Sequence, residues 1–303
     1  MTHRHAHAPR RVEDCYAIDD LRALARHRLP RAVFDFYEGG AEDESTLAGN
    51  REAYAHWQFS PRVLVDVAQA STACTLLGAP AAMPAAIAPT GAAGFGHRHA
   101  DVALARAAAH LGIPYTLSTS ATTSIETIAS QAPGRHWFQA YVLRDQAFFW
   151  RLIERARAAD YEALMITVDL PVGGKRERDF NNHFSIPFRF SMRNMWDFAS
   201  CPRWALDMLL RGMPVMENLR GLEAAATSAT AIASSVGRSY DPSFDWERLA
   251  QVRDRWPRKL IVKGVTRAED AARLAAMGVD AIVVSNHGGA SVGWRSRDLA
   301  SVA

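Results

Sequence analysis

The sequence predicts an α/β fold of the parallel (β/α)8 barrel type, and three observations lead to this prediction. Short apolar runs, such as residues 259–262 and 281–284, pass directly into polar residues. Buried parallel strands have this pattern when they carry functional side chains at their C-terminal ends. Residues 266–277, between these runs, have the period of an amphipathic helix and are followed by Gly278. Upstream, strand-like and helix-like segments alternate at about 22 to 30 residues per unit.

Residues 1–60 are predicted to form a helical segment ahead of the barrel. Two short helical patterns occupy residues 18–37. Asp19 or Asp20 can cap the first helix, and Pro30 suits the first turn of the second. A Gly-rich turn follows, and residues 61–67 then begin a strand-and-turn region.

The predicted barrel occupies residues 61–289, in which strand-like runs end at polar or turn residues. About six of the eight units of a complete barrel can be identified. The candidate strands are residues 85–88, 115–117, 137–142, 163–168, 259–264 and 281–284, and the candidate helices upstream are residues 100–111, 124–130 and 145–158. A doubly wound sheet is the alternative, but Gly91, Gly94 and Gly96 lack the G-x-G-x-x-G spacing of its phosphate loop.

Composition narrows the functional class. The chain has 303 residues and a net charge of +3, and its basic residues form no long cluster, so nothing indicates nucleic-acid binding. Its three cysteines are odd in number and far apart, so they predict neither a disulfide framework nor a metal site. Residues 1–12 contain no apolar stretch of the kind found in signal peptides. A reducing, cytoplasmic location is therefore expected.

Lys263 and His287 lie at the ends of two consecutive predicted strands, where (β/α)8 barrels carry their active sites. The motifs around them, V-K-G and S-N-H-G-G, resemble those of the FMN-dependent 2-hydroxy-acid oxidases and dehydrogenases. That family includes glycolate oxidase, L-lactate dehydrogenase and mandelate dehydrogenase. The resemblance implies an FMN cofactor and the oxidation of a small L-2-hydroxy acid, of lactate or mandelate type, to its 2-oxo acid. Electrons would then pass to a quinone or another acceptor.

The resemblance also implies roles for individual residues. His287 resembles the family's catalytic base, and Asp169 the carboxylate that orients it. Tyr141 and Arg176 fall where side chains contact the substrate, and Phe36 stands where the family has a substrate-binding Tyr. The residues that fall at flavin contacts are Pro89, Thr90, Gly91, Ser118, Gln139, Thr167, Lys263 and Ser285.

A long insertion, at about residues 180–245, follows the fourth predicted strand. Residues 187–219 are rich in aromatic, Met and Arg residues, and they resemble the insertion of the family's membrane-associated dehydrogenases. Two interpretations remain open, an interfacial helix that attaches the protein to the cytoplasmic face of the inner membrane and a lid packed on the barrel. The family's members are homo-oligomers, which the resemblance extends to this chain.

The resemblance is not found beyond Gly289. Ala290 stands where the family has a second carboxylate-binding Arg, and residues 290–303 show neither a helical nor a strand period. These residues are predicted to be a foreign tail, such as a frameshift would produce. Two alternatives to the dehydrogenase therefore remain: an inactive truncated product without bound FMN, and another barrel enzyme that binds FMN or a phosphate.

Overall fold

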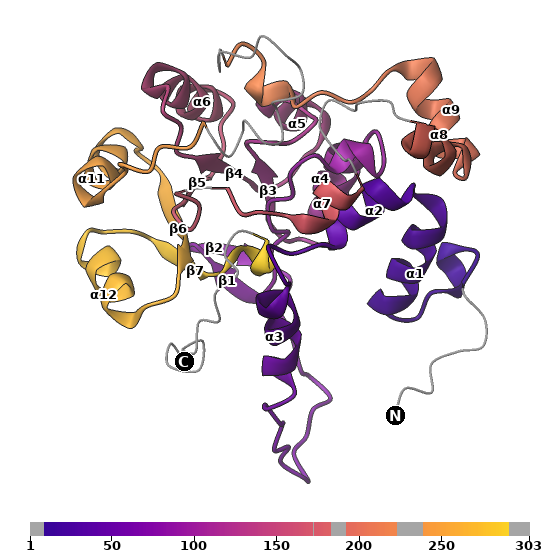
Figure 1. Ribbon diagram of the computed structural model, residues 1–303. Coiled ribbons are helices and arrows are strands. Elements are labelled where there is room, and N and C mark those ends of the chain that lie inside the picture. The colour runs from indigo at the N-terminus through magenta and orange to yellow at the C-terminus, as the bar shows by residue number, and fades with distance from the viewer. Residues whose placement is uncertain (1–8, 172, 183–191, 223–238, 291–303) are drawn as a thin grey trace.

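The computed structural model describes residues 9–171, 173–182, 192–222 and 239–290. Within these residues, parallel strands form an arc with helices outside it, and the sheet does not close into a barrel (Figure 1). The order of the strands in the sheet follows the chain. They are β3 (Tyr115–Ser118), β4 (His136–Tyr141), β5 (Ala163–Thr167), β6 (Lys259–Val265) and β7 (Ala281–Val284). The prediction of parallel strands that alternate with helices is confirmed.

Three of the described helices outside the sheet begin at a residue whose side chain caps the first turn. Ser124 accepts a hydrogen bond from the amide of Thr127 at 3.1 Å, and Asp145 accepts one from Phe148 at 2.9 Å. Asp245 does the same for Arg248 at 3.0 Å. Such caps satisfy amide groups that the first helical turn leaves without partners. The helices are α4 (Ala100–His110), α5 (Ile125–Gln131), α6 (Gln146–Ala158), α11 (Trp246–Arg255) and α12 (Ala268–Ala276).

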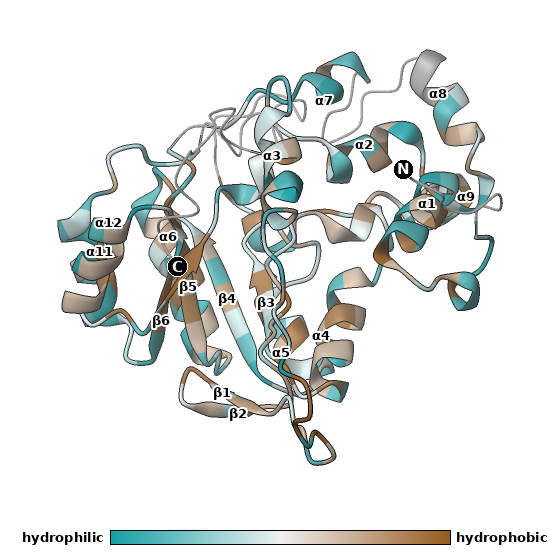
Figure 2. Ribbon diagram, turned by 90° about the horizontal axis from the view of Figure 1, so that it is seen from below, coloured by the Kyte–Doolittle hydropathy of each residue, from teal (hydrophilic) through white to brown (hydrophobic). Residues whose placement is uncertain are grey.

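The two faces of the sheet carry different side chains. The outer face packs against the helices through residues such as Phe138, Leu164 and Val262, all at most 1% exposed. On the inner face, Trp137 and Met165 belong to a small apolar cluster. Figure 2 shows the hydrophobic colouring of β3 and β5. Because side chains alternate along a strand, each strand buries one apolar set under the helices and presents the other to the interior of the arc.

A hairpin that the sequence did not predict covers the N-terminal end of this interior. It consists of β1 (Cys74–Leu76) and β2 (Ala79–Ala81), which pair antiparallel. Leu77 in its turn packs against the inner apolar cluster. Arg135 donates hydrogen bonds to the carbonyls of Leu76 at 2.6 Å and Pro80 at 3.0 Å, and this attaches the hairpin to the start of β4.

Two strand predictions are wrong. Residues 85–88 form no strand but a single parallel bridge between Ile87 and Tyr115. Pro84 and Pro89 flank this segment, and prolines have no amide hydrogen to donate to a sheet. Residues 61–67 are not a strand either: they find no neighbouring strand among the described residues, and their apolar side chains are exposed.

The N-terminal region forms the two predicted helices, preceded by a short helical turn and followed by a third helix. Asp20 accepts hydrogen bonds from the amides of Tyr16 and Ala17, both at 3.0 Å, at the start of the first helix. Pro30 immediately precedes the second helix. The elements are η1 (Val12–Asp14), α1 (Ile18–Arg28), α2 (Arg31–Glu38) and α3 (Ser45–Tyr54).

The insertion between β5 and β6 packs partly onto these N-terminal helices. The carboxylate of Asp197 accepts hydrogen bonds from the amides of Arg31 and Ala32, at 2.8 and 3.0 Å, at the start of α2. Trp204 donates to the carbonyl of Phe95, in η2 (Ala93–Phe95), at 2.7 Å. Residues 183–191 and 223–238 of the predicted insertion, and 291–303 of the predicted tail, lie outside the described residues. The elements described here are α7 (Glu177–Asn181), α8 (Met192–Ala199), α9 (Pro202–Arg211) and η3 (Glu217–Leu219).

Candidate active site

Four of the predicted site residues meet at the C-terminal end of the sheet. His287 places Nδ1 3.0 Å from Asp169 Oδ1 and 3.1 Å from Lys263 Nζ, and its Nε2 lies 3.2 Å from the hydroxyl of Tyr141. Lys263 Nζ is also 3.4 Å from Asp169 Oδ2. The four side chains come from β4, the end of β5, β6 and the turn after β7. They form one cluster because parallel strands end at the same edge.

Gly264 allows Asp169 to reach this cluster. Its φ of +105° lies in a region that side chains disfavour, and β6 has an irregular register at this point. A Cβ atom on Gly264 would lie 2.5 Å from Cβ of Asp169. The backbone of β6 therefore passes directly against Asp169, and only glycine leaves room for that approach.

The turn that carries His287 has an unusual backbone. His287 has a φ of +59°, in the left-handed region, and the glycines on its C-terminal side also have positive φ values. Ser285 accepts a hydrogen bond from the His287 amide at 3.0 Å. Asn286 and Asn50 exchange two side-chain hydrogen bonds, at 2.7 and 3.0 Å. Ser285, predicted as a flavin contact, thus supports the His287 backbone, and α3 holds the same turn from the other side.

Burial and charge shift the titration of two members of the cluster. Lys263 is only 8% exposed, and this burial lowers the pKa of its ammonium group. The negative charge of Asp169 and the hydrogen bond that Lys263 donates to it raise the same pKa and so oppose the effect of burial. Burial raises the pKa of Tyr141, and the charge of Asp169 adds to the increase. Tyr141 therefore remains a neutral phenol beside the imidazole.

A row of polar side chains crosses the inner face of the sheet near this cluster. Ser118 donates to Gln139 Oε1 at 3.1 Å, and Gln139 Nε2 donates to Thr167 at 2.8 Å. Thr167 in turn pairs with Lys263 in the β5–β6 register. Hydroxyl, amide and ammonium groups in one buried row suit a ring system rich in hydrogen-bond donors and acceptors, such as the flavin that the resemblance implies.

The loop predicted to contact the flavin, at residues 88–91, lies next to this row. A Cβ on Gly91 would lie 3.2 Å from Cβ of Ser120 and 3.9 Å from the hydroxyl of Ser118. The amide of Ala92 donates to the carbonyl of Ser120 at 2.8 Å. Pro89, Thr90 and Gly91 thus belong to a loop that the turn after β3 holds by main-chain contacts.

Arg176 and Phe36 contact one another, and the hydrogen bonds of the Arg176 side chain go to residues outside the His287 cluster. The guanidinium of Arg176 lies 4.9 Å from the centre of the Phe36 ring and donates to the carbonyls of Phe36 and Gly39. Its Nε is 3.2 Å from the carboxylate of Asp179. Burial, together with the nearby Asp35, raises the pKa of Asp179 to about 6, although Arg176 opposes the increase.

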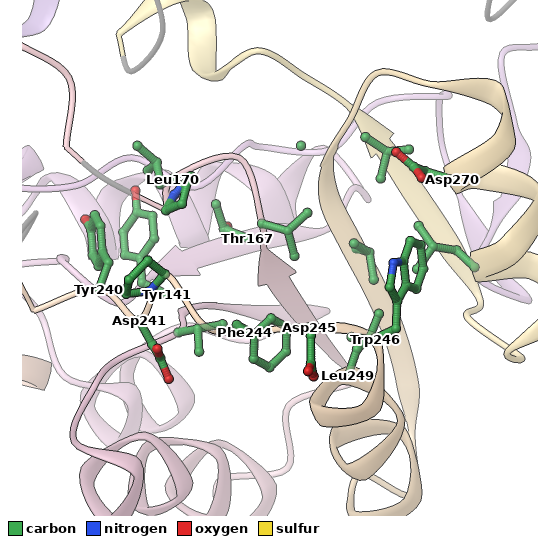
Figure 3. A pocket seen from close by; sticks show the side chains of 18 residues that line it. Tyr141, Thr167, Leu170, Tyr240, Asp241, Phe244, Asp245, Trp246, Leu249 and Asp270 are labelled. Atoms are coloured by element: carbon green, nitrogen blue, oxygen red, sulfur yellow. The ribbon is translucent and has the colours of Figure 1, made fainter.

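A cavity of about 180 Å³ lies beside the cluster, on the helix side of the sheet (Figure 3). Tyr141, Thr167 and Tyr240 form part of its wall, and apolar residues such as Trp246 and Leu249 form much of the remainder. This cavity therefore belongs to the layer between strands and helices rather than to the polar inner face. Among the described residues, no His, Cys, Asp and Glu side chains gather as a metal site.

Sequence reasoning missed some residues of the site. The ring of Tyr240 lies 4.8 Å from that of Tyr141, centre to centre, and no motif identified it. Asn50 was missed as well, because its pairing with Asn286 is a contact between segments 236 positions apart. The sequence offers no signal for such contacts beyond the residue types themselves.

Comparisons with known proteins agree with this geometry. The sequence model of the FMN-dependent dehydrogenase family matches residues 25–301. The chain is 42% identical to (S)-mandelate dehydrogenase of Pseudomonas putida, over 91% of this chain and 70% of the relative. It is 40% identical to a putative L-lactate dehydrogenase of Mycobacterium tuberculosis, over 92% of this chain and 66% of the relative.

A solved structure is similar to this one over nearly the same span. It is described as the crystal structure of the monotopic membrane protein (S)-mandelate dehydrogenase, and it superposes with a TM-score of 0.87 at 41% identity. The alignment covers 92% of this chain and 74% of that one. Relatives of this kind have an α/β barrel, of which the parallel sheet and its helices form part. The matches to the family model and to these relatives show that the chain, with its Lys263–His287 cluster, belongs to the family of FMN-dependent 2-hydroxy-acid dehydrogenases.

Proposed function

We propose that this protein oxidises an L-2-hydroxy acid of mandelate or lactate type to the 2-oxo acid. The observation that carries the proposal is the contact of His287 with Asp169, Lys263 and Tyr141 in one cluster. Bound FMN would supply the two-electron acceptor, and a quinone or another acceptor would then reoxidise it. The remaining tasks fall to side chains of this chain.

His287 is the base in this proposal. In the proposed tautomer Nδ1 carries the proton and donates to Asp169, so that Nε2 accepts the substrate proton once the acid takes the place of the Tyr141 hydroxyl at that nitrogen. As the imidazole becomes positively charged, the neighbouring carboxylate stabilises it. Tyr141, a neutral phenol at Nε2, is placed to donate a hydrogen bond to the substrate beside the base.

Lys263 and the polar row would hold the flavin ring. The Lys263 ammonium would supply a positive charge that stabilises the reduced, negatively charged flavin. Ser118, Gln139 and Thr167 supply hydroxyl and amide groups along the same face. These hydroxyl, amide and ammonium groups support a flavin site on this face, where residues 88–91 would lie beside the ring.

Arg176 is the proposed partner of the substrate carboxylate, because its guanidinium is permanently charged and, with Nη2 donating to the carbonyls of Phe36 and Gly39, its Nη1 is left to donate to the acid. The Phe36 ring lies against Arg176 and fills space there without donating a hydrogen bond. Both an aromatic and a small 2-hydroxy acid are compatible with such a neighbour. The family's mandelate and lactate dehydrogenases span both substrate sizes.

The test is anaerobic reduction of the purified, FMN-supplemented protein. We expect a yellow protein whose visible flavin absorbance is bleached by L-mandelate or L-lactate and not by the D-enantiomers. A protein that retains flavin but is bleached by neither acid would reject the substrate assignment. A colourless protein after FMN addition would instead favour the inactive alternative.

The outer face of the insertion supports a second proposal, peripheral attachment to a membrane. Trp196, Leu209 and Leu210 on α8 and α9 are 77%, 81% and 72% exposed, while the opposite face of these helices packs on α2. Exposed apolar side chains on short helices suit the interfacial region of a bilayer. No helix among the described residues is long and apolar enough to cross a membrane. The similar mandelate dehydrogenase is described as monotopic.

Vesicle cosedimentation tests this attachment. Replacing both Leu209 and Leu210 by Gln should lower the bound fraction on vesicles that contain anionic lipid, because burial of each leucine contributes about 1.5 to 3 kcal/mol. Val215→Gln, at another exposed apolar position beyond α9, serves as a single-site comparison. Equal binding of the double variant and the wild type would contradict attachment through this face.

A further inference from the structure

The turn at residues 39–44 contacts both chain segments that carry the proposed active-site residues. The amide of Ala41 donates to the carbonyl of Gly289 at 2.8 Å, and the amide of Glu42 donates to the carbonyl of Lys175 at 2.7 Å. Ala41 and Glu42 are consecutive residues. The segment with His287 and the segment with Arg176 are therefore held at adjacent peptide groups of one turn.

The same turn also holds the Arg176 side chain. Its guanidinium donates to the carbonyl of Gly39 at 3.1 Å and to that of Phe36. Space in the turn is restricted, since a Cβ on Gly39 would lie 2.8 Å from the Asp35 carbonyl. A Cβ on Gly40 would lie 3.1 Å from the carbonyl of Gly289. The consecutive glycines allow this close packing, which an added side chain would disturb.

Glu44 stabilises the turn from within. Its Oε1 accepts a hydrogen bond from the amide of Gly40 at 3.0 Å, and its Oε2 pairs with the guanidinium of Arg178. Its own φ is +61°, a left-handed conformation that costs a non-glycine residue free energy and persists where surrounding contacts compensate. One carboxylate thus joins the turn to α7, next to Arg176.

We propose that Glu44 is a positioning residue that sets the spacing between Arg176 and His287. It touches neither the substrate nor the flavin; it acts through the turn and through Arg178. This inference rests on the proposed function, because it assumes that Arg176 binds the carboxylate of the acid from which His287 removes a proton. This role would explain the segment E-G-G-A-E-D-E at residues 38–44, whose side chains take no part in the proposed chemistry.

The experiment compares Glu44→Ala and Glu44→Gln with the wild type. Gln retains an acceptor for the Gly40 amide but loses the charge that pairs with Arg178, whereas Ala loses both. Glu52→Ala is the control, since Glu52 is an exposed glutamate on α3, the helix that follows Glu44. The measurements are KM and kcat with the acid that reduces the wild type, the Kd of the non-reacting carboxylate phenylacetate, FMN content and Tm.

We expect Glu44→Ala to raise KM and the phenylacetate Kd by about 10-fold or more with FMN content unchanged, because small displacements of binding groups weaken substrate positioning strongly. Glu44→Gln should show a smaller increase, and Glu52→Ala none. Unchanged KM and Kd in Glu44→Ala, with only a lower Tm, would overturn the proposal and leave a structural role.

A double-mutant cycle separates an effect through Arg176 from a general one. If Glu44 acts through Arg176, its substitution should raise the phenylacetate Kd much less in an Arg176→Lys background than in the wild type. Equal fold-changes in both backgrounds would overturn the proposal. The cycle can use Glu44→Gln if the Ala variant does not fold.

Failure of the proposed function has a different signature. A wild-type protein that binds phenylacetate but is reduced by no 2-hydroxy acid would reject the reaction and still allow the cycle to test the positioning role. A wild-type protein that does not bind phenylacetate would overturn the positioning role together with the carboxylate site.

Discussion

Gly264→Ala tests whether the close approach of β6 to Asp169 organises the cluster. The substitution adds one methyl group, which would lie 2.5 Å from Cβ and 2.7 Å from Cγ of Asp169. Carbon atoms in contact normally lie about 3.5 to 4.0 Å apart, so the two chains must separate by about 1 Å. Asp169 would then move relative to His287, to which its hydrogen bond is 3.0 Å long.

Two contributions to the free energy of unfolding can be separated. A φ of +105° is strained for alanine, at a cost of order 1 to 3 kcal/mol. The steric contact adds an overpacking cost of about 1 to 3 kcal/mol. The sum, about 2 to 6 kcal/mol, corresponds to a decrease in Tm of roughly 4 to 24 °C, since 1 kcal/mol shifts Tm by about 2 to 4 °C for domains of about 150 to 250 residues.

Gly278→Ala is the matched control. Gly278 has a φ of +74°, and a Cβ there would meet nothing within 4 Å. Its substitution therefore carries backbone strain, about 1 to 2 kcal/mol, without the steric contact. The assay combines thermal unfolding followed by circular dichroism with stopped-flow measurement of flavin reduction.

We expect Gly264→Ala to lower Tm more than Gly278→Ala and to slow flavin reduction by about 100-fold, the effect of a displacement near 1 Å in a positioned group. Gly278→Ala should leave the rate of reduction unchanged. Equal losses of Tm in the two variants, together with an unchanged rate in Gly264→Ala, would refute the argument that this contact positions Asp169.

Three further predictions concern the site. His287→Gln should lower turnover by about two to four orders of magnitude while FMN remains bound, because a base contributes to the chemical step; near-normal turnover would reject its role. Phe36→Tyr should lower KM for lactate, since one hydrogen bond to a carboxylate contributes about 1.5 to 3 kcal/mol; an unchanged KM would mean that the ring does not face the acid. The pKa of Asp179 is raised from 3.8 to about 6, so the folded state binds more protons than the unfolded state between these values, and wild-type stability falls as pH rises through that window. Asp179→Asn should therefore gain Tm relative to the wild type from pH 4 to pH 7; a constant difference across that range would contradict the shift.

The alternation of strands and helices could be predicted from the sequence. Apolar runs such as residues 163–167 are buried on both faces in the structure, and their composition reflects this environment. The helix starts at Ser124, Asp145 and Asp245 were also predictable, because a cap is a contact between residues three positions apart. These features depend on neighbours within a few residues, so the sequence carries their signal directly.

The candidate site was predictable in its members but not in its geometry. Lys263 and His287 stand at the ends of consecutive strands, and the register of parallel strands brings such ends to one edge. The motif did not indicate that Ser285 would hold the His287 backbone, or that Arg176 would donate to the carbonyls of Phe36 and Gly39.

Tertiary structure alone decided the long-range contacts. The β1–β2 hairpin covers the interior because Arg135 and Leu77 find partners there, and residues 61–67 form no strand because no neighbouring strand is available among the described residues. Asn50 meets Asn286 across 236 positions. A strand or a polar pair exists only when a distant segment supplies its hydrogen bonds, and local residue preferences do not specify which distant segment that will be.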